Sequence, residues 1–221
     1  MNRRNRQLLI EGAERLQITL PENAIDRLVR YCDEILLWNR KMNLVRAGER
    51  DLVIRHVLDS LAIVPLFDRF QVRSDRPLLD VGSGAGFPGL PFAIAEPNIG
   101  VVLLDRSSRR CAFLNTVRLL LNLENVFVVE GDAAAYDDRH ARIVCRAFLQ
   151  FENAVPMLRR LLVPGGMIFV LSSSSTNPGS KPEWSDMDIS LHRLDVPFLD
   201  AERSVIQMTD LSVREPIDDS S

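Results

Sequence analysis

Hydrophobic and polar residues follow helical spacing in the first third of this chain and strand-like runs afterwards. Between residues 21 and 40, apolar positions recur at intervals that place them on one face of a predicted helix. These positions are Ile25, Leu28, Val29, Cys32, Ile35 and Leu36. A second run of this kind covers residues 51–67, and the segment SDRP at 74–77 ends it. We therefore predict a small helical extension over residues 1–75.

From Pro77 onward, short apolar runs alternate with segments of helical pattern. The strand-like runs are PLLDV, VVLLD, VFVVE, RIVC and MIFVL. This alternation predicts an α/β domain over residues 76–221, with a mostly parallel sheet and helices on both faces. The last two runs, DISLHRLDV and RSVIQMTDLSV, have no helix between them and predict an antiparallel strand pair that completes the sheet. The polar segment at 172–182 predicts a mobile loop.

A glycine-rich segment, GSGAGFPG, follows the first predicted strand. Open α/β sheets bind ligands at the carboxyl ends of their strands, and Gly82, Gly84 and Gly86 allow a sharp turn there with main-chain N–H groups against a ligand. A dinucleotide loop needs G-x-G-x-x-G, whose third glycine would fall at Phe87. The observed spacing, with Ser83 between the first two glycines, instead matches an S-adenosylmethionine loop, in which the aminoacyl end lies over the glycines. An ordinary tight turn is the alternative.

Acidic residues after the strands support a cofactor that contains a nucleoside. Asp80 ends the first apolar run and Asp105 ends the second, where its carboxylate can accept hydrogen bonds from both ribose hydroxyls. Because NAD also has such a ribose, Asp105 does not distinguish the two cofactors. Asp132 follows the third strand, where an adenine amino group would lie. A helix N-cap at Asp105 and a turn acid at Asp132 are the alternatives.

Composition narrows the class of protein further. The 221 residues carry a net charge of −3, which gives no overall signature of nucleic-acid binding. The cysteines at 32, 111 and 145 are odd in number and lie far apart, so neither a disulfide framework nor a zinc site is expected. No run of about 18 apolar residues occurs. We expect a cytoplasmic protein with no membrane segment and no bound metal.

Two further motifs flank the glycine loop. LLWNRKMNLVRAGERDLVIRHVLDSL occupies 36–61, and VCRAF at 144–148 ends the fourth predicted strand. Together with VGSGAGFPGLP they cover roughly residues 30–170. In these motifs the chain resembles the RsmG (GidB) family of class I S-adenosylmethionine-dependent methyltransferases, which have a Rossmann-like fold.

The resemblance implies transfer of a methyl group from S-adenosylmethionine to N7 of one guanine in the decoding-region loop of 16S ribosomal RNA. It implies 16S RNA or the small ribosomal subunit as partner, and we expect a monomer. By family motif, Gly82, Phe87 and Arg146 match cofactor-contacting positions, as do Ala133 and Ala134 through backbone and surface. The alternatives are another RNA or small-molecule target, a nucleotide-dependent oxidoreductase, and a non-catalytic cofactor-binding partner of the ribosome.

The chemistry of this reaction makes few demands on the side chains. Guanine N7 has an in-plane lone pair and attacks without losing a proton, so no general base is required and catalysis is mainly positioning. Arg146 is the candidate catalytic residue and could face the cofactor, guanine O6 or a phosphate. Cys145 is expected to be a buried, inert thiol. His56 and Asp59 share a helix face; we favour a structural pair over a cap on the cofactor pocket.

Basic residues near the functional edge of the sheet are candidates for RNA contact. We predict phosphate binding by Arg40, Lys41, Arg46, Arg106, Arg109 and Arg110. Trp38 is expected to pack in the core. The chain departs from the family pattern in three places: LSSSS after the fifth strand lacks a lysine, AAAY at 133–136 lacks acidic residues, and the C-terminal end is acidic. These departures concern RNA recognition and leave the glycine loop unchanged.

Overall fold

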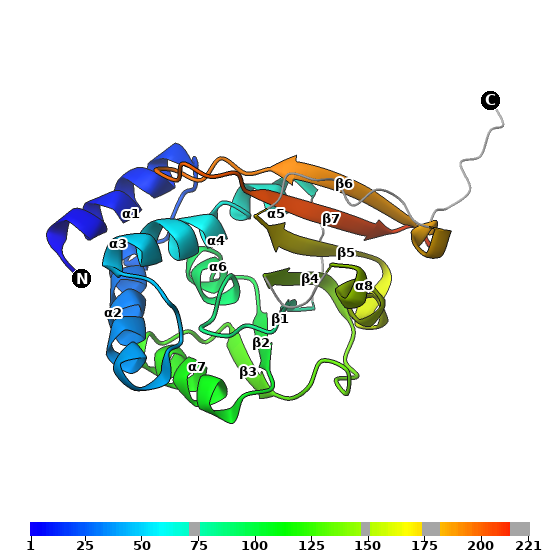
Figure 1. Ribbon diagram of the computed structural model, residues 1–221, viewed down its shortest axis with the longest axis horizontal. Helices are drawn as coiled ribbons and strands as arrows, with labels where there is room; N and C mark the ends of the chain where they lie inside the picture. Colours follow the sequence, from blue (N-terminus) through cyan, green and yellow to red (C-terminus); the bar gives the residue numbers. More distant parts are fainter. Residues whose placement is uncertain (71–75, 147–150, 174–181, 213–221) are drawn as a thin grey trace.

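The computed structural model describes residues 1–70, 76–146, 151–173 and 182–212. In these residues, seven strands form one sheet in the order β3-β2-β1-β4-β5-β7-β6 (Figure 1). The strands are β1 (Leu78–Val81), β2 (Val101–Asp105), β3 (Val126–Glu130), β4 (His140–Arg146), β5 (Leu162–Ser172), β6 (Met187–Arg193) and β7 (Ser204–Asp210). Strands β1 to β5 pair in parallel, and β7 is antiparallel to both β5 and β6. The predicted mostly parallel sheet with a final antiparallel pair is confirmed.

The helices appear close to where the apolar spacing predicts them. They are α1 (Arg3–Arg15), α2 (Ala24–Met42), α3 (Glu49–Leu52), α4 (Asp59–Leu61), α5 (Val64–Phe70), α6 (Gly89–Ala95), α7 (Ser108–Leu120) and α8 (Phe151–Arg160), with a π-helical turn η1 (Val53–Leu58) and a 3-10 turn η2 (Pro182–Trp184). The predicted run 51–67 is divided into several pieces. Pro65 has no N–H for the carbonyl four residues earlier, so the helix breaks before it.

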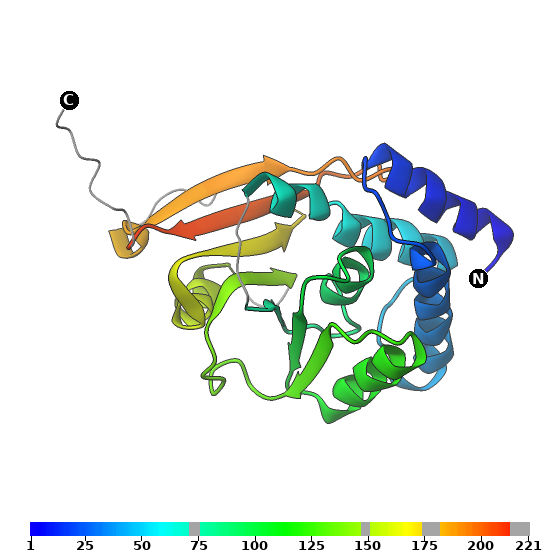
Figure 2. The same cartoon turned by 180° about the vertical axis from the view of Figure 1, so that it is seen from behind.

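Two hydrophobic cores lie on the two faces of the sheet because successive strand residues point to opposite sides. Leu78 and Leu103 belong to the core beneath α6, α7 and the N-terminal helices. Leu79 and Leu104 belong to the second core, which α8 covers. Seen from behind, the N-terminal helices and α8 stand on opposite sides of the molecule (Figure 2). Helices on both faces are thus confirmed.

The N-terminal helices share the first core with the sheet and hold the glycine-rich loop directly. Leu28 and Leu58 are fully buried in the same cluster as Phe92 and Phe113. The Tyr31 hydroxyl in α2 donates a hydrogen bond to the carbonyl of residue 85 at 2.6 Å. The division of the chain at residue 75 into an extension and a binding domain stays a prediction.

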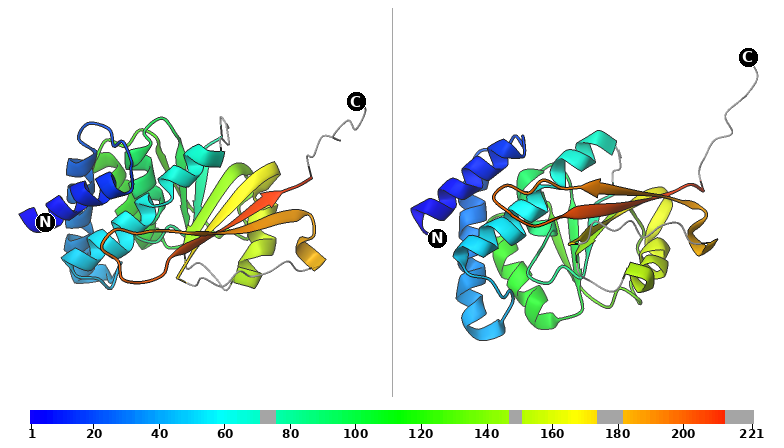
Figure 3. Two further views of the ribbon diagram at one scale, coloured as in Figure 1. Left: turned by 90° about the horizontal axis from the view of Figure 1, so that it is seen from above. Right: turned by 45° about the horizontal axis from the view of Figure 1, so that its top comes forward.

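The C-terminal strand pair connects the sheet back to the N-terminus. The loop between β6 and β7 reaches α1 (Figure 3), and the Arg15 guanidinium lies 4.4 Å from the ring centre of Phe198. Strand β5 begins five residues earlier than its predicted apolar run at 167–171, with an irregular register opposite His140 and Arg142. The predicted mobile loop at 172–182 falls mostly outside the described residues, as do residues 147 and 148 of the VCRAF motif and the acidic end at 213–221.

We expect Tyr31→Phe to lower the free energy of unfolding by about 1–3 kcal/mol, because it leaves a buried carbonyl without its donor. Urea unfolding followed by circular dichroism measures the change. Tyr136→Phe is the control, since the partly exposed Tyr136 hydroxyl contacts His140 where water can replace it. Equal stabilities of Tyr31→Phe and the unmodified protein would contradict a role for this bond in holding the loop.

Candidate functional site

The glycine-rich loop satisfies its own backbone groups inside the protein. The three predicted glycines at 82, 84 and 86 have φ of 72°, 61° and 97°, which favours residues without a Cβ atom. Gly82 and Ser83 donate their N–H groups to the Leu104 carbonyl at 2.8 and 3.1 Å. Gly84 donates to Asp105 Oδ2 at 2.8 Å. These three N–H groups thus bond to β2 and shape the loop, and contact of the loop with a ligand stays a prediction.

The glycines differ in what surrounds them. A Cβ at Gly86 would lie 2.4 Å from Leu90, and one at Gly89 would lie 2.4 Å from Leu103, so both positions are needed for packing. A Cβ at Gly84 would meet nothing closer than a backbone oxygen at 3.8 Å. Gly84 thus presents the open side of the loop, where another molecule can approach the backbone.

Asp80 lies behind the loop rather than on its open side. Its side chain is fully buried, and Oδ2 accepts a hydrogen bond from the Gly89 N–H at 3.0 Å. Ser83 is also buried, and its hydroxyl donates to the Asp80 carbonyl. Burial raises the pKa of Asp80 to about 7, and its Oδ1 has no hydrogen-bond partner among the described residues. Both residues therefore act on the loop from its inner side.

A cavity of about 400 Å³ opens beside the loop over the carboxyl ends of β2 and β3. It brings together five of the predicted cofactor residues, Gly82, Asp105, Asp132, Ala133 and Ala134. The Asp105 carboxylate is buried and accepts hydrogen bonds from two N–H groups, one in the loop and one at residue 107. Each carboxylate oxygen can accept two hydrogen bonds, so capacity for two hydroxyl donors remains.

The far wall of this cavity is held by a residue from another element. Arg160, at the end of α8, donates to the carbonyls of Ala133 and Ala134 at 2.7 and 3.0 Å. Asp132 is exposed, and its Oδ1 accepts from the Ala134 N–H at 2.9 Å, which is the predicted alternative of a turn acid. Ala133 and Ala134 contribute backbone and surface, and Arg160 sets their position.

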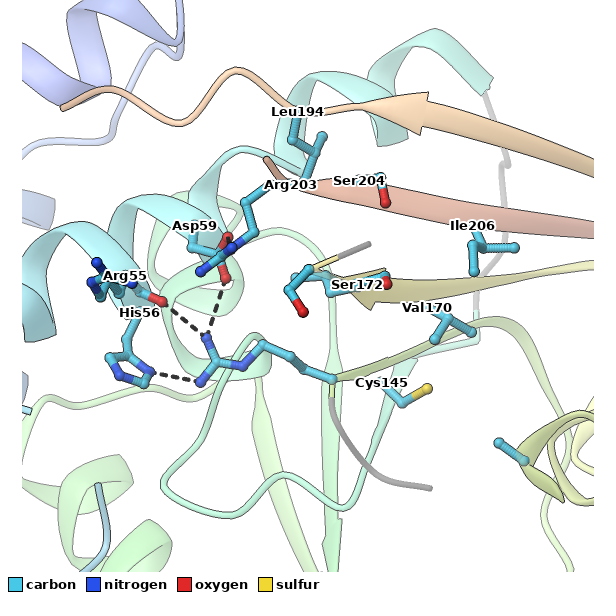
Figure 4. Close-up of a pocket in the computed structure, with 14 residues that line it drawn as sticks. Arg55, His56, Asp59, Cys145, Val170, Ser172, Leu194, Arg203, Ser204 and Ile206 are labelled. Atoms are coloured by element: carbon cyan, nitrogen blue, oxygen red, sulfur yellow. Dashed lines mark hydrogen bonds and ion pairs between the residues drawn. The ribbon is translucent and has the colours of Figure 1, made fainter. Parts of the chain in front are cut away.

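A second cavity, of about 490 Å³, lies over the carboxyl ends of β4 and β5 (Figure 4). Arg146, at the end of β4, extends into its wall and donates to Asp59 Oδ2 at 3.3 Å and to His56 Nδ1 at 2.7 Å. Because a guanidinium can only donate, His56 is neutral with its proton on Nε2. Burial, aided by the Arg146 charge, lowers the pKa of His56 to about 4. His56 and Asp59 therefore both contact Arg146 in the cavity wall, which is a structural role of the kind that we favour for them.

Phe87 connects this cavity to the glycine loop. Its ring lies 5.4 Å from that of Tyr31 and 5.1 Å from that of His56, and the Arg146 guanidinium is 5.1 Å from its centre. Phe87 is buried, so it anchors the loop against η1. His56 lies within the π-helical turn and Asp59 directly follows it, and such turns are frequent at functional sites. Neither Phe87 nor Arg146 is among the residues that line the first cavity.

Two predicted core residues lie where they were expected. Cys145 is buried, and burial raises the pKa of its thiol to about 12, which makes it a poor nucleophile. Trp38 packs edge-on against Phe113 at 5.4 Å between ring centres.

The candidate RNA contacts are all on the surface. Exposed side chains are found at Arg40, Lys41, Arg46, Arg106, Arg109 and Arg110. Arg106 and Arg110 line the first cavity, and Arg110 approaches Asp105 to 3.6 Å. Their role in RNA binding stays a prediction.

Sequence reasoning missed three residues that shape the site. Tyr31 and Arg160 act through backbone carbonyls of residues far away in sequence, and no motif signals such contacts. Arg203 lines the second cavity and binds Asp59 Oδ1 at 3.0 Å. A signal for Arg203 did exist: the predicted last strand is antiparallel, so its first residues lie at the same edge as the carboxyl ends of the parallel strands.

Some kinds of site are absent from the described part of the chain. None of its helices is long and apolar enough to cross a membrane. Within the same residues, no group of three or more histidine, cysteine or acidic side chains could hold a metal ion.

Solved structures share this fold. TrmN from Thermus thermophilus superposes with a TM-score of 0.51 at 18% identity, covering 72% of this chain and 53% of that chain. NSun6 from Pyrococcus horikoshii gives 0.52 at 11% identity, covering 70% and 51%. The protein therefore has the Rossmann-like methyltransferase fold that its motifs predict.

Sequence comparison identifies the family. The family model described as GidB, rRNA small subunit methyltransferase G, matches residues 24–206. Proteins named ribosomal RNA small subunit methyltransferase G are 35% identical in Neisseria meningitidis serogroup A, over 93% of this chain and 98% of that protein, and in Burkholderia vietnamiensis, over 91% of each. The chain belongs to this family. Its function is S-adenosylmethionine-dependent methylation of 16S ribosomal RNA at guanine N7, as the motifs predict, and the oxidoreductase alternative is rejected.

The titration of His56 gives a testable consequence for stability. Because its folded-state pKa of about 4 lies below the ordinary value of 6.5, the unfolded chain takes up a proton first as pH falls. The free energy of unfolding should therefore fall between pH 6.5 and 4, by at most about 1.4 kcal/mol per pH unit for this proton. In His56→Asn, which keeps an acceptor for Arg146, we expect a shallower fall in urea unfolding. His140 titrates alike in both proteins, so identical slopes would contradict a neutral, buried His56.

Proposed function

We propose that the two cavities hold the two reactants of methyl transfer: S-adenosylmethionine beside the glycine loop, and the target guanine beside Arg146. The observation that carries this proposal is their placement. The first cavity lies over β2 and β3, the second over β4 and β5, and the strand order reverses between β1 and β4. Open α/β sheets bind ligands at such a switch point.

The residues around the first cavity suit this cofactor. The open side of Gly84 leaves room for the aminoacyl end, and Asp105 keeps acceptor capacity for the ribose hydroxyls. Ala133 and Ala134 offer a flat wall for an adenine ring, with Asp132 beside it. When bound, S-adenosylmethionine supplies an electrophilic methyl group on a positively charged sulfur.

The residues around the second cavity suit a base that needs no deprotonation. His56 already accepts a hydrogen bond from Arg146, so it has no free basic nitrogen at Nδ1. Arg146 can donate to guanine O6, which lies beside N7 on the same edge of the base. Arg146 lies at the end of β4 and contacts the ring of Phe87 in the glycine loop. These groups orient the base and leave the attack to N7 itself, which is catalysis by positioning.

The finer features of the substrate are part of the same proposal. The target is a guanine in the decoding-region loop, and the enzyme acts on it as a cytoplasmic monomer. The net charge of the chain is −3, which gives little general attraction for RNA, so a preformed RNA shape in the small subunit must assist docking.

Transfer of labelled methyl from S-adenosylmethionine to small subunits from cells that lack this protein tests the function. We expect one labelled site, cleavable as 7-methylguanine, in the decoding-region loop. Because no general base takes part, the rate of transfer should change little between pH 6.5 and 8.5. Label at another atom or in no RNA would contradict the proposal.

The loop gives a sharper test of the cofactor site. We expect Gly84→Leu to abolish binding of S-adenosylmethionine in calorimetry, because the side chain fills the open side of the loop. Its left-handed backbone should cost only about 1–2 kcal/mol of stability.

The matched control is Gly86→Ala, whose Cβ overlaps Leu90 in the core and should destabilise the fold. A folded Gly84→Leu protein with normal cofactor affinity would refute the proposed site.

A further inference from the structure

One carboxylate in the second cavity binds two arginines, one at the end of β4 and one directly before β7. Asp59, the first residue of α4, accepts from Arg146 Nη1 at 3.3 Å through Oδ2 and from Arg203 Nε at 3.0 Å through Oδ1. Its side chain is only 4% exposed, and the two arginine side chains are 20% and 17% exposed. Figure 4 shows Asp59 beside Arg203 at the cavity wall. These two contacts join the N-terminal helices to the end of β4 and to the start of β7.

The ion cluster is poorly explained as a stabilising feature. Burial raises the pKa of Asp59 even though both guanidiniums oppose that effect, which shows a substantial desolvation cost. Buried ion pairs often stabilise no better than apolar residues of similar volume. A role in binding explains why charged groups are kept at this wall.

The cavity has an excess of positive charge although the chain as a whole is acidic. Arg55, Arg146 and Arg203 line it together with neutral His56, and Asp59 is the only carboxylate among its described lining residues. The lining therefore carries a net charge of +2, against −3 for the whole chain. Such a cavity attracts an anion, and every nucleotide of an RNA strand carries one.

Arg203 retains donors that can bind that anion. Its Nε is used by Asp59 and its Nη1 donates to the Glu202 carbonyl at 2.9 Å. Nη2 has no hydrogen-bond acceptor among the described residues. The Asp59 contact fixes the plane of the guanidinium, so Nη2 is held in place at little entropic cost when a phosphate arrives.

We propose that Asp59 is a positioning residue for methyl transfer, which holds Arg203 against a phosphate of the RNA strand next to the target guanine while Arg146 faces the base. This inference rests on the proposed function, because it takes the second cavity as the substrate side. Without Asp59 the two guanidiniums repel each other and lose their common orientation.

Salt dependence of RNA binding tests the phosphate contact. In Arg203→Gln we expect the slope of log affinity against log salt to fall by about 0.7–0.9, the share of one phosphate. The KM for RNA should rise about 10-fold to 100-fold, as for loss of a charged hydrogen bond. Affinity for S-adenosylmethionine should stay unchanged. Asp26→Asn, which removes an exposed ion pair with Arg6, is the control. It should change neither the salt slope nor the KM for RNA.

A double-mutant cycle tests the positioning role of Asp59. We expect Asp59→Asn to raise the KM for RNA in the same way. Arg203→Gln should add little to the effect of Asp59→Asn, because both changes remove the same contact between Arg203 and the RNA phosphate. Additive effects, or an equal loss of cofactor affinity, would show a merely structural role. If Asp59→Asn does not fold, the salt slope of Arg203→Gln decides alone.

The outcomes also separate this inference from the proposed function. Transfer to guanine N7 by the unmodified protein, with an unchanged salt slope in Arg203→Gln, overturns the inference and leaves the function standing. No transfer by the unmodified protein overturns both.

Discussion

The hydrogen bond from the Gly84 N–H to Asp105 is the contact on which the site depends. It ties the loop after β1 to the end of β2, and the neighbouring N–H groups reinforce it by donating to Leu104. Contacts within the protein therefore set the shape of the loop. Since Tyr31 holds the next residue of the loop from the other side, the N-terminal helices contribute to that shape as well. The loop is preorganised, and cofactor binding need not order it.

Arg146 extends this rigidity across the switch point. Its guanidinium contacts His56, Asp59 and the ring of Phe87, so one side chain joins β4, the π-helical turn and the glycine loop. Positioning catalysis requires that the two binding places keep a constant distance. A network of short contacts between three elements provides that constraint better than an isolated side chain could.

Much of the fold could be predicted from the sequence because apolar periodicity reports which face of an element is buried. The glycine spacing likewise predicted the loop, and the position of Asp105 at a strand end predicted its place in the cavity. Periodicity does not report which partner a buried face meets, so Tyr31 and Arg160 were missed. Periodicity also does not report the direction of hydrogen bonds, and the N–H groups of the loop donate to acceptors inside the protein. Arg203 was missed because it precedes an antiparallel strand, whereas the rule for ligand sites concerns the carboxyl ends of parallel strands.

The charge balance of the second cavity bears on the kind of substrate it accepts. Methylation at N7 gives guanine a positive charge, and the base would then lie beside three arginines with Asp59 as the one carboxylate among the described lining residues. In a partly buried cavity such repulsion is only weakly screened. A free base would meet it without compensation. A nucleotide within an RNA strand brings its own phosphates, and a phosphate held by Arg203 neutralises part of the excess. The same arginines that attract the strand therefore tolerate the cationic product only while the strand is bound, which favours RNA over a small molecule as the substrate.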